Sequence, residues 1–322
     1  MIPRILASGL VALATTFSHG PAQAQAFPNK PLKVYMPGAP GGSFDILTRL
    51  AMTRLSEVLK QPVVVENYTG AGGMIAVERC LAGTADGYSL CITYTGNLAI
   101  APYIFNKMPY DPVKDVKPVS LLGSVSYVFA VPAASPYKSV QELLVYARAN
   151  PGKITYASSG NGTGAHVGGE MIKSTMKIDM THIPHQGNAP AAIALLGGHV
   201  DWSFEALPTS LPNVKAAKLR ALAVSTLNRQ RDLPEVPTMA ELGFPGFDLT
   251  SWVAVSVPAA TPDPVVEQLN AAINKVLEMP DIKEAYRQRG AQTLGGSQQK
   301  FATFLQAELG LYSKVMGKAK AD

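Results

Sequence analysis

The sequence predicts an α/β protein made of two lobes, in each of which helices flank a mostly parallel sheet. Strand-like apolar runs alternate with segments that carry apolar residues at helical spacing, which is typical of such sheets. Two glycine-rich corners, Pro37–Asp45 and Tyr156–His166, each stand between a strand and a helix. A short Val-Pro-Ala-Ala string also occurs twice, which indicates that the chain passes between the lobes twice.

Length and composition fit this class. With 322 residues, of which 47% are hydrophobic, the chain can bury a large core, and its length favours two domains. The net charge of +5 favours anionic ligands only weakly, and the basic residues are scattered rather than clustered with aromatic residues. Nucleic acid is therefore not an expected partner.

Residues 1–26 have the pattern of a secretory signal peptide. Arg4 gives a short basic start, an apolar segment follows, and two A-x-A sites would place cleavage near Ala24 or Ala26. No cysteine directly follows the apolar segment, so a lipid anchor is not expected. From Phe27 onward no apolar run is long enough to span a bilayer. We therefore expect an exported mature protein without a membrane span.

The first glycine corner joins a strand over 32–36 to a helix over 46–59. Gly41 and Gly42 lack a Cβ, so a ligand can approach the backbone closely between these elements. The free N–H groups at a helix start and the helix dipole favour negative charge. The corner therefore predicts an anion site, and the alternative is that its Pro and Gly residues only turn the chain.

The next elements continue the alternation. A strand over 63–67 leads through the glycine corner 69–73 into a helix over 74–81, and a strand over 89–94 follows. Open α/β sheets bind ligands beyond the carboxyl ends of their strands. The loop at 93–97, where the last of these strands ends, is therefore a second candidate for ligand contact.

Cys80 and Cys91 are the two cysteines of the sequence, and they fall on the predicted helix and strand just described. Both have apolar neighbours, so two buried free thiols are the favoured interpretation, and a disulfide in an oxidising compartment is the alternative. Neither has the Cys or His neighbours that a metal site needs.

The repeated string predicts where the lobes meet. Val131–Pro136 and Val257–Pro262 each follow a strand-like run and precede a helical pattern. If the chain crosses between the lobes at both places, the crossovers form a hinge. We predict a discontinuous lobe 1, 27–127 plus 251–322, and a continuous lobe 2, 128–250. The alternative is a chance resemblance between two short Pro/Ala strings.

The second glycine corner lies in lobe 2, between a strand over 153–157 and a helix that runs through Ile172. It offers Ser, Thr and Asn side chains and backbone amides, and no acidic residue occurs before Glu170 to repel an anion. Two donor-rich corners in separate lobes suggest the two sides of a cleft for a small anion.

The remaining expected elements are strands over 179–183, 202–204 and 220–225 and helices over 191–196 and 301–316. Trp202 and Phe204 are expected in the core, whereas Phe44 and Tyr94 stand in glycine corners and are candidates for ligand contact.

Cofactor and metal chemistry are less well supported. Gly160–Ala165 fits the G-x-G-x-x-A dinucleotide pattern, but Asp179 would begin a strand rather than end one. His182 and His185 would face opposite sides of a strand and could not chelate one metal ion. No cofactor and no metal are therefore expected.

Eight motifs occur in a fixed order along the chain: Pro40-Gly41-Gly42-x-x-Asp45, Val64-Val-Glu-Asn67 with Gly70-Ala71-Gly72-Gly73, Asp86-Gly87-Tyr88, Pro109-Tyr110-Asp111-Pro112-x-x-Asp115, Tyr156-Ala-Ser-Ser-Gly-Asn-Gly-Thr163, Gly197-Gly198-x-x-Asp201, Lys218-Leu-Arg-Ala-Leu-Ala-Val224 and Pro234-x-Val-Pro-Thr238. With these motifs the chain resembles the substrate-binding proteins of the tripartite tricarboxylate transporter system, the Bug or TctC-like family of Gram-negative bacteria. The resemblance runs from about Phe27 to the C-terminus.

The resemblance implies a periplasmic binding protein with a type II-like, two-lobed fold. Such a protein closes on a small organic carboxylate, which can be a mono-, di- or aromatic acid, and delivers it to the large and small membrane subunits of its transporter. We expect a monomer in the periplasm and no enzymatic activity. Two alternatives stay open: a sensing role, in which the closed form is presented to a sensor kinase, and an exported serine hydrolase that uses Ser158 or Ser159 with His166, although no G-x-S-x-G elbow is present.

The resemblance also implies where the ligand is held. Backbone amides and ordered water at the loops matching 40–45 and 158–163 would hold a carboxylate, and the loops matching 94–97, 185–187 and 205–208 would line the other end of the ligand. The family usually has Pro-Tyr-Lys-Gly where Pro184-His185-Gln186-Gly187 stands, and commonly Asp where Glu205 stands, so the identity of the acid stays open. The expected ligand-binding residues are Pro40, Gly41, Gly42, Ser43, Phe44, Asp45, Tyr94, Thr95, Ser158, Gly160, Asn161, Gly162, Thr163, His166, His185, Gln186, Glu205 and Pro208.

Overall fold

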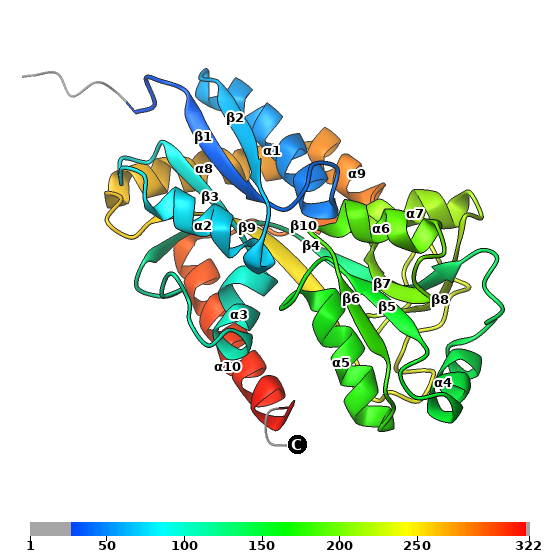
Figure 1. Cartoon of the computed structure of the whole chain (residues 1–322). Coiled ribbons are helices and arrows are strands. Elements are labelled where there is room, and N and C mark those ends of the chain that lie inside the picture. Colours follow the sequence, from blue (N-terminus) through cyan, green and yellow to red (C-terminus); the bar gives the residue numbers. More distant parts are fainter. Residues whose placement is uncertain (1–26, 320–322) are drawn as a thin grey trace, which may run out of the picture.

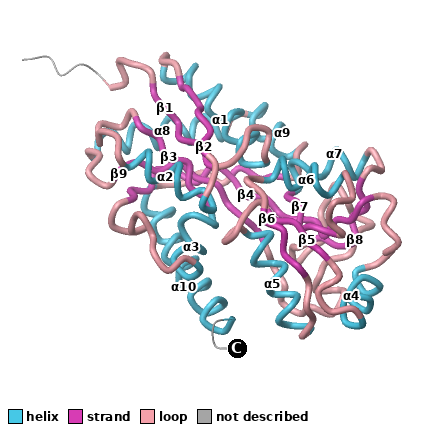
Figure 2. The backbone as a smooth tube through the Cα atoms, in the orientation of Figure 1, coloured by secondary structure: helices cyan, strands magenta, loops and turns pink. Residues whose placement is uncertain are grey.

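The computed structural model describes residues 27–319, with side chains as far as Lys314, and the predicted signal peptide 1–26 lies outside the described residues. Two bodies lie side by side, and one ten-stranded sheet runs through both in the order β2-β1-β3-β9-β4-β7-β5-β6, with β8 and β10 also paired to β4 (Figure 1). Helices cover both faces of this sheet (Figure 2). Every helix within 27–319 falls short of the length and apolarity that a membrane span requires.

The first body is built on parallel strands, as predicted. β1 pairs in parallel with both β2 and β3, because a helix crosses over after each of the first two strands. The predicted elements are found with ends that differ by at most three residues. In chain order the elements are β1 (Leu32–Pro37), α1 (Ser43–Leu59), β2 (Val63–Tyr68), the short helix η1 (Ala71–Gly73), α2 (Met74–Leu81), β3 (Ser89–Tyr94), the π-helical turn η2 (Thr95–Ile100) and α3 (Ala101–Ile104).

The second body repeats this arrangement. β5 pairs in parallel with β6 and β7, and helices fill the connections. Its first helix starts where Ser139 accepts a hydrogen bond from the Glu142 amide, which is a standard N-cap. The elements are α4 (Val140–Ala149), β5 (Thr155–Ser158), α5 (Gly164–Met176), β6 (Thr181–Pro184), α6 (Asn188–Leu196), β7 (Trp202–Ala206), α7 (Leu207–Lys215) and β8 (Leu219–Val224).

Two long strands, β4 (Val116–Pro132) and β9 (Thr250–Pro258), connect the bodies. β4 pairs with β9 as far as Ser126 and with β7 and β8 from Tyr127 onward, and all of these pairings are antiparallel. The sequence predicted a strand-like run before Val131, whereas β4 already begins at Val116. Pro118 of this strand lies at a register shift, where a strand tolerates it. The lobe limits given above stay a prediction.

The chain then returns to the first body. α8 (Asp263–Leu277) was predicted, and α10 (Gln298–Ala319) extends the predicted tail helix at both ends. Two short elements between them, α9 (Pro280–Arg287) and β10 (Ala291–Thr293), were not predicted. The Tyr286 hydroxyl donates to the Leu47 carbonyl over 2.9 Å and so ties α9 to α1.

A continuous apolar core runs through both bodies. In the second body the ring of Phe129 on β4 stacks on that of Trp202 at 4.1 Å between centroids, and Phe204 meets both rings edge-on. Trp202 and Phe204 are fully buried, which confirms their predicted place in the core. These rings fix β7 against the strand that connects the two bodies.

The expectation of free thiols is wrong. Cys80 on α2 and Cys91 on β3 form a disulfide with a Cα–Cα distance of 5.5 Å. The sequence could not decide this, because the pairing depends on how α2 packs back onto β3.

We expect the Cys80→Ala/Cys91→Ala variant to lose about 2–3 kcal/mol in the free energy of unfolding, because the bond closes a short loop in the unfolded chain. Urea titration of both proteins at one pH measures this difference. Two thiols that react in denatured, unreduced wild-type protein would contradict the pairing.

Candidate ligand-binding site

A pocket of about 300 Å³ lies between the two bodies and is lined by residues of both. Four helices, α1, α2, α5 and α6, begin at its wall with the N-cap residues Gly42, Gly73, Thr163 and Gly187, and none of these has a side-chain cap. The N–H groups of uncapped helix starts need partners, and the helix dipoles favour negative charge there. The pocket is therefore suited to an anion.

The first glycine corner is held in shape by Asp45, which is only 3% exposed. Its carboxylate accepts hydrogen bonds from the Gly41 amide at 2.9 Å, from Arg49 at 3.0 Å and from Asn67 at 2.9 Å. Gly41 has a φ of +78°, a conformation that favours glycine. The Asp45 carboxylate is thus paired with donors of the protein itself, and these bonds fix the turn that presents the start of α1 to the pocket.

The second glycine corner is held by its own hydroxyl groups. The Gly160 carbonyl accepts from Thr163 Oγ1 at 2.7 Å, and the Gly160 amide donates to Ser158 Oγ at 3.1 Å. Gly160 has a φ of +128°, a backbone conformation that residues with a side chain rarely adopt. These bonds shape the loop within itself and set the start of α5 at the pocket.

Aromatic residues form part of the wall. Phe44 and Tyr94 lie 5.1 Å apart between ring centroids, and the Tyr94 hydroxyl donates to the Gly72 carbonyl at 2.6 Å. Tyr127, from the strand that connects the bodies, donates to Ser251 Oγ at 2.7 Å. Burial raises the pKa of Tyr127 to about 12 and that of Tyr94 further, so both phenols stay neutral.

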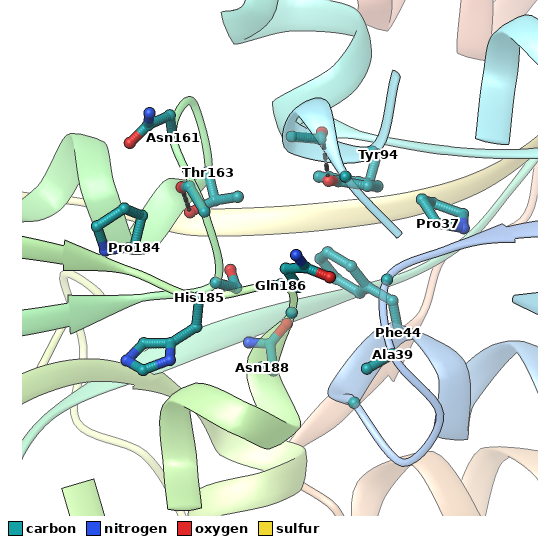
Figure 3. A pocket seen from close by; sticks show the side chains of 18 of the residues that line it. Pro37, Ala39, Phe44, Tyr94, Asn161, Thr163, Pro184, His185, Gln186 and Asn188 are labelled. Carbon is teal, nitrogen blue, oxygen red and sulfur yellow. Dashed lines mark hydrogen bonds between the residues drawn. The ribbon is translucent and has the colours of Figure 1, made fainter. Parts of the chain in front are cut away.

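The loop after β6 closes the pocket from the second body. Figure 3 shows Gln186 and Asn188 beside Phe44 and Ala39 of the first body, whereas the His185 ring points away from them. Burial lowers the pKa of His185, and its Nε2 is buried without a hydrogen-bond partner among the described residues. His185 therefore contributes a neutral ring.

Among the described residues that line the pocket there is no lysine or arginine, and Asp45 is the one acidic residue. An anion must therefore be held by backbone amides, hydroxyl groups, side-chain amides and water, all of which can bind a carboxylate well. No cluster of three or more His, Cys, Asp or Glu side chains within 27–314 could hold a metal ion.

Half of the predicted site residues line the pocket, and the other half do not. Gly162 and His166 support the second corner, Thr95 accepts a hydrogen bond from the Trp252 amide, and Ser43 bonds to Thr209 of α7. The pocket also uses Gly70–Gly73, a corner that the sequence showed, and Tyr127 and Ser251 of the connecting strands, for which no local signal exists. The predicted residues that line it are Gly42, Phe44, Asp45, Tyr94, Gly160, Asn161, Thr163, His185 and Gln186; those that do not are Pro40, Gly41, Ser43, Thr95, Ser158, Gly162, His166, Glu205 and Pro208.

Ser158 has the wrong surroundings for a nucleophile. Its side chain is fully buried, and its Oγ lies 2.6 Å from Nε2 of His182 rather than beside His166. No carboxylate among the described residues is hydrogen-bonded to His182, so the third member of a triad is missing. Ser159 lines the pocket but has no histidine hydrogen-bonded to it among these residues.

Glu205 is buried on β7 and does not line the pocket. Its Oε1 lies 2.8 Å from Ser203 Oγ, and its Oε2 has no partner among the described residues. Burial raises the pKa of this carboxyl to about 7, because no cation lies near enough to offset the loss of water.

We expect Glu205→Gln to change how stability depends on pH. A carboxyl with a raised pKa holds its proton longer in the folded than in the unfolded chain, so the free energy of unfolding falls as pH rises from about 4.5 to about 7 and is level above. Glutamine does not titrate, so the variant should gain on the order of 2 kcal/mol relative to wild type across this window. Urea titrations at pH 4.5, 6 and 7.5 measure the difference, and parallel stability curves would contradict it.

Comparison with known proteins identifies the family. The family model described as "Tripartite tricarboxylate transporter family receptor" matches residues 47–319. The chain belongs to this family. BugT of Bordetella pertussis is 32% identical over 319 residues, which cover 99% of this chain and 98% of BugT. The predicted Bug or TctC-like membership is therefore confirmed.

Solved structures of similar proteins superpose closely on this chain. A protein of R. palustris solved with adipate is 33% identical, with a TM-score of 0.86, and the match covers 90% of this chain and 98% of that one. MatC of Rhodopseudomonas palustris, solved with bound malate, is 29% identical, with a TM-score of 0.87 and coverage of 90% and 100%. The predicted periplasmic binding protein fold is confirmed, and the chain is a solute-binding receptor of this family. The individual ligand contacts stay predictions.

Proposed function

We propose that this protein captures a small organic carboxylate between its two lobes in the periplasm and delivers it to the membrane subunits of a tripartite tricarboxylate-type transporter. The observation that carries the proposal is the meeting of four uncapped helix starts, from both bodies, at a pocket that has no cationic side chain. Such a pocket favours one negatively charged group held by amides. The adipate and malate bound by the two relatives are ligands of this kind.

The proposal includes the lobe division 27–127 plus 251–322 and 128–250, with β4 and β9 as the hinge. The two parts meet on both sides of the pocket. A Cβ at Gly72 would lie 2.7 Å from the Asn161 carbonyl, and one at Gly187 would lie 3.0 Å from the Ala39 amide. These contacts describe a closed form, which a ligand that touches both lobes would favour over an open one. The proposed protein is a monomer, released from its signal peptide near Ala24 or Ala26.

The test uses the mature protein, residues 27–322, unfolded and refolded to remove any acid that was purified with it. Adipate, malate, benzoate and a series of further mono- and dicarboxylates are titrated by calorimetry and by thermal shift. At least one acid should bind and raise the melting temperature, since ligand at 100 times its Kd stabilises the fold by about 2.7 kcal/mol. The corresponding primary amides, which lack the charge, serve as controls and should bind far more weakly.

Two assays distinguish the proposed binding protein from the alternative, a serine hydrolase, which would hydrolyse esters and react with a serine-directed probe. The results expected for the binding protein are as follows. Ester substrates should not be turned over, and a serine-directed fluorophosphonate should not label the protein, because Ser158 is buried. Binding of no acid to ligand-free protein, or stoichiometric labelling of Ser158 or Ser159 with turnover, would contradict the proposed function.

A further inference from the structure

Two histidines of the second body lie face to face behind the second glycine corner. His166 on α5 and His182 on β6 have ring centroids 4.2 Å apart and ring planes 21° apart. Both are half-buried, and neither lines the pocket. The proposed function makes no use of them, although each contacts the loop that forms one wall of the ligand site.

Each ring holds a different part of this loop, 158–163. His182 Nε2 lies 2.6 Å from Ser158 Oγ, and the same hydroxyl oxygen accepts from the Gly160 amide at 3.1 Å. His166 Nδ1 accepts from the Gly162 amide at 3.2 Å. The two rings therefore fix both the start and the end of the turn that leads into α5.

The bond to Gly162 shows which form of His166 the loop requires. A backbone N–H can only donate, so His166 Nδ1 must carry a lone pair and the ring must be neutral, with its proton on Nε2. A proton on Nδ1 would set two N–H groups against each other, and the loop or the ring would have to move. The stacked rings also cannot both become charged without strong repulsion.

The rings themselves cannot easily turn aside. The His182 ring stacks on that of Tyr156 at 4.8 Å, which stacks on Trp202 at 5.0 Å, which stacks on Phe129 of β4 at 4.1 Å. This column of rings runs across β6, β5, β7 and β4 beneath α5. When His166 is protonated, the glycine loop is therefore expected to move rather than the ring stack.

Burial is the largest effect that favours neutral rings, and the charged groups around the pair act in both directions. On α5, Glu170 favours protonation of both rings and Lys173 opposes it, while the Tyr156 hydroxyl and Lys173 both bond to the Glu170 carboxylate. His185, after β6, further disfavours a charge on His182. Burial lowers the pKa of His166 below its ordinary value, and burial together with His166 lowers that of His182 to about 4.

We propose that His166 and His182 are positioning residues that keep the 158–163 loop in its binding form only while both rings are neutral, so that acidification loosens the loop and weakens carboxylate binding. This inference rests on the proposed function for its effect on ligand. Protonation of His166 is the step that acts directly on the loop, because its Nδ1 accepts the Gly162 amide bond that a proton there would break. Where one proton must leave for the ligand to bind, affinity falls up to about tenfold per pH unit below the pKa of that ring.

The first experiment needs no ligand. In the mature protein, the ring resonances of His166 and His182 and the amide resonance of Gly162 are followed by NMR from pH 8 to pH 4.5. The Gly162 amide should shift with the same midpoint as the His166 ring, and that midpoint should lie below 6.5. In His166→Asn, whose Oδ1 can replace Nδ1 as the acceptor, the Gly162 shift should disappear while the fold is kept.

The second experiment measures binding of adipate and malate at pH 7.5 and pH 5.0 by calorimetry. Protonation of the acids themselves affects all proteins equally, so the comparison between proteins isolates the histidines. The ratio of the affinity at pH 7.5 to that at pH 5.0 is compared between proteins, and this ratio should be at least about fivefold larger for wild type than for His166→Asn. His182→Gln, whose amide can replace Nε2, should show a smaller reduction in pH dependence. The exposed His199, changed to Gln, is the matched control and should behave as wild type.

Three results would overturn the inference: a Gly162 amide that does not follow His166, equal pH profiles for wild type and His166→Asn, or an affinity that rises on acidification because an imidazolium attracts the acid. These differ from failure of the proposed function. If neither adipate nor malate nor any other acid of the series binds at any pH while the Gly162 amide follows His166, the proposed function fails and the positioning role in the loop stands.

Discussion

Replacing Asp45 with alanine is expected to abolish most of the affinity for carboxylate, with a loss of about 100-fold. The carboxylate ties the Gly41 amide, Arg49 and Asn67 together beneath the first glycine corner, and the start of α1 depends on that geometry. Hydrogen bonds to a charged group contribute about 1.5–3 kcal/mol each, so the free energy of unfolding should also fall by about 2–4 kcal/mol. Calorimetry with the best acid of the series and urea titration measure the two effects.

The matched control is Glu57→Ala, which removes a carboxylate of the same helix that pairs with Arg54 at the surface. Such exposed pairs contribute little, so its affinity should stay within about twofold of wild type and its free energy of unfolding should be close to that of wild type. Full affinity in a folded Asp45→Ala protein would show that the corner does not position the ligand.

Linking the lobes covalently should trap the ligand. Ser43 Oγ at the start of α1 and Thr209 Oγ1 at the start of α7 lie 3.1 Å apart, on opposite lobes of the proposed division. Cysteines at both positions should form a disulfide, since the side-chain ends already meet and a small adjustment would bring the two sulfur atoms to bonding distance. In the cross-linked Ser43→Cys/Thr209→Cys protein, exchange of labelled acid should slow by at least about 100-fold, because the lobes can no longer open.

The single variants Ser43→Cys and Thr209→Cys are the controls. Reducing the cross-link would be a poorer control, because a reductant could also open the Cys80–Cys91 bond. Both should exchange ligand about as fast as wild type. Exchange at the wild-type rate in protein whose cross-link is verified by mass spectrometry would mean that the ligand enters and leaves without lobe opening.

The glycine corners could be predicted because their conformations leave a local signature. Gly41 and Gly160 have positive φ values, and each is followed by a helix whose apolar spacing is visible in the chain. Where a strand, a turn of this kind and a helix follow one another, the helix start must lie at the carboxyl end of the sheet. The two walls of the pocket follow from that rule.

The rest of the site depends on how distant segments pack. Tyr127 and Ser251 meet across 124 positions only because β4 and β9 are neighbours in the sheet. Ser158 and Glu205 belong to segments that the sequence predicts near the ligand, yet both side chains are buried and neither residue lines the pocket. A shift of one residue along a strand decides whether a side chain faces the pocket or the interior, and the sequence pattern does not place the end of a strand to within one residue.

The most direct test of the account is a crystal structure of the mature protein with the acid that binds best. The account predicts a carboxylate between the lobes, within hydrogen-bond distance of backbone amides at the start of α1 near Gly42 and at the start of α5 near Gly164, with no cationic side chain in contact. An acid bound to one lobe alone, or held by a lysine or arginine outside this pocket, would contradict it.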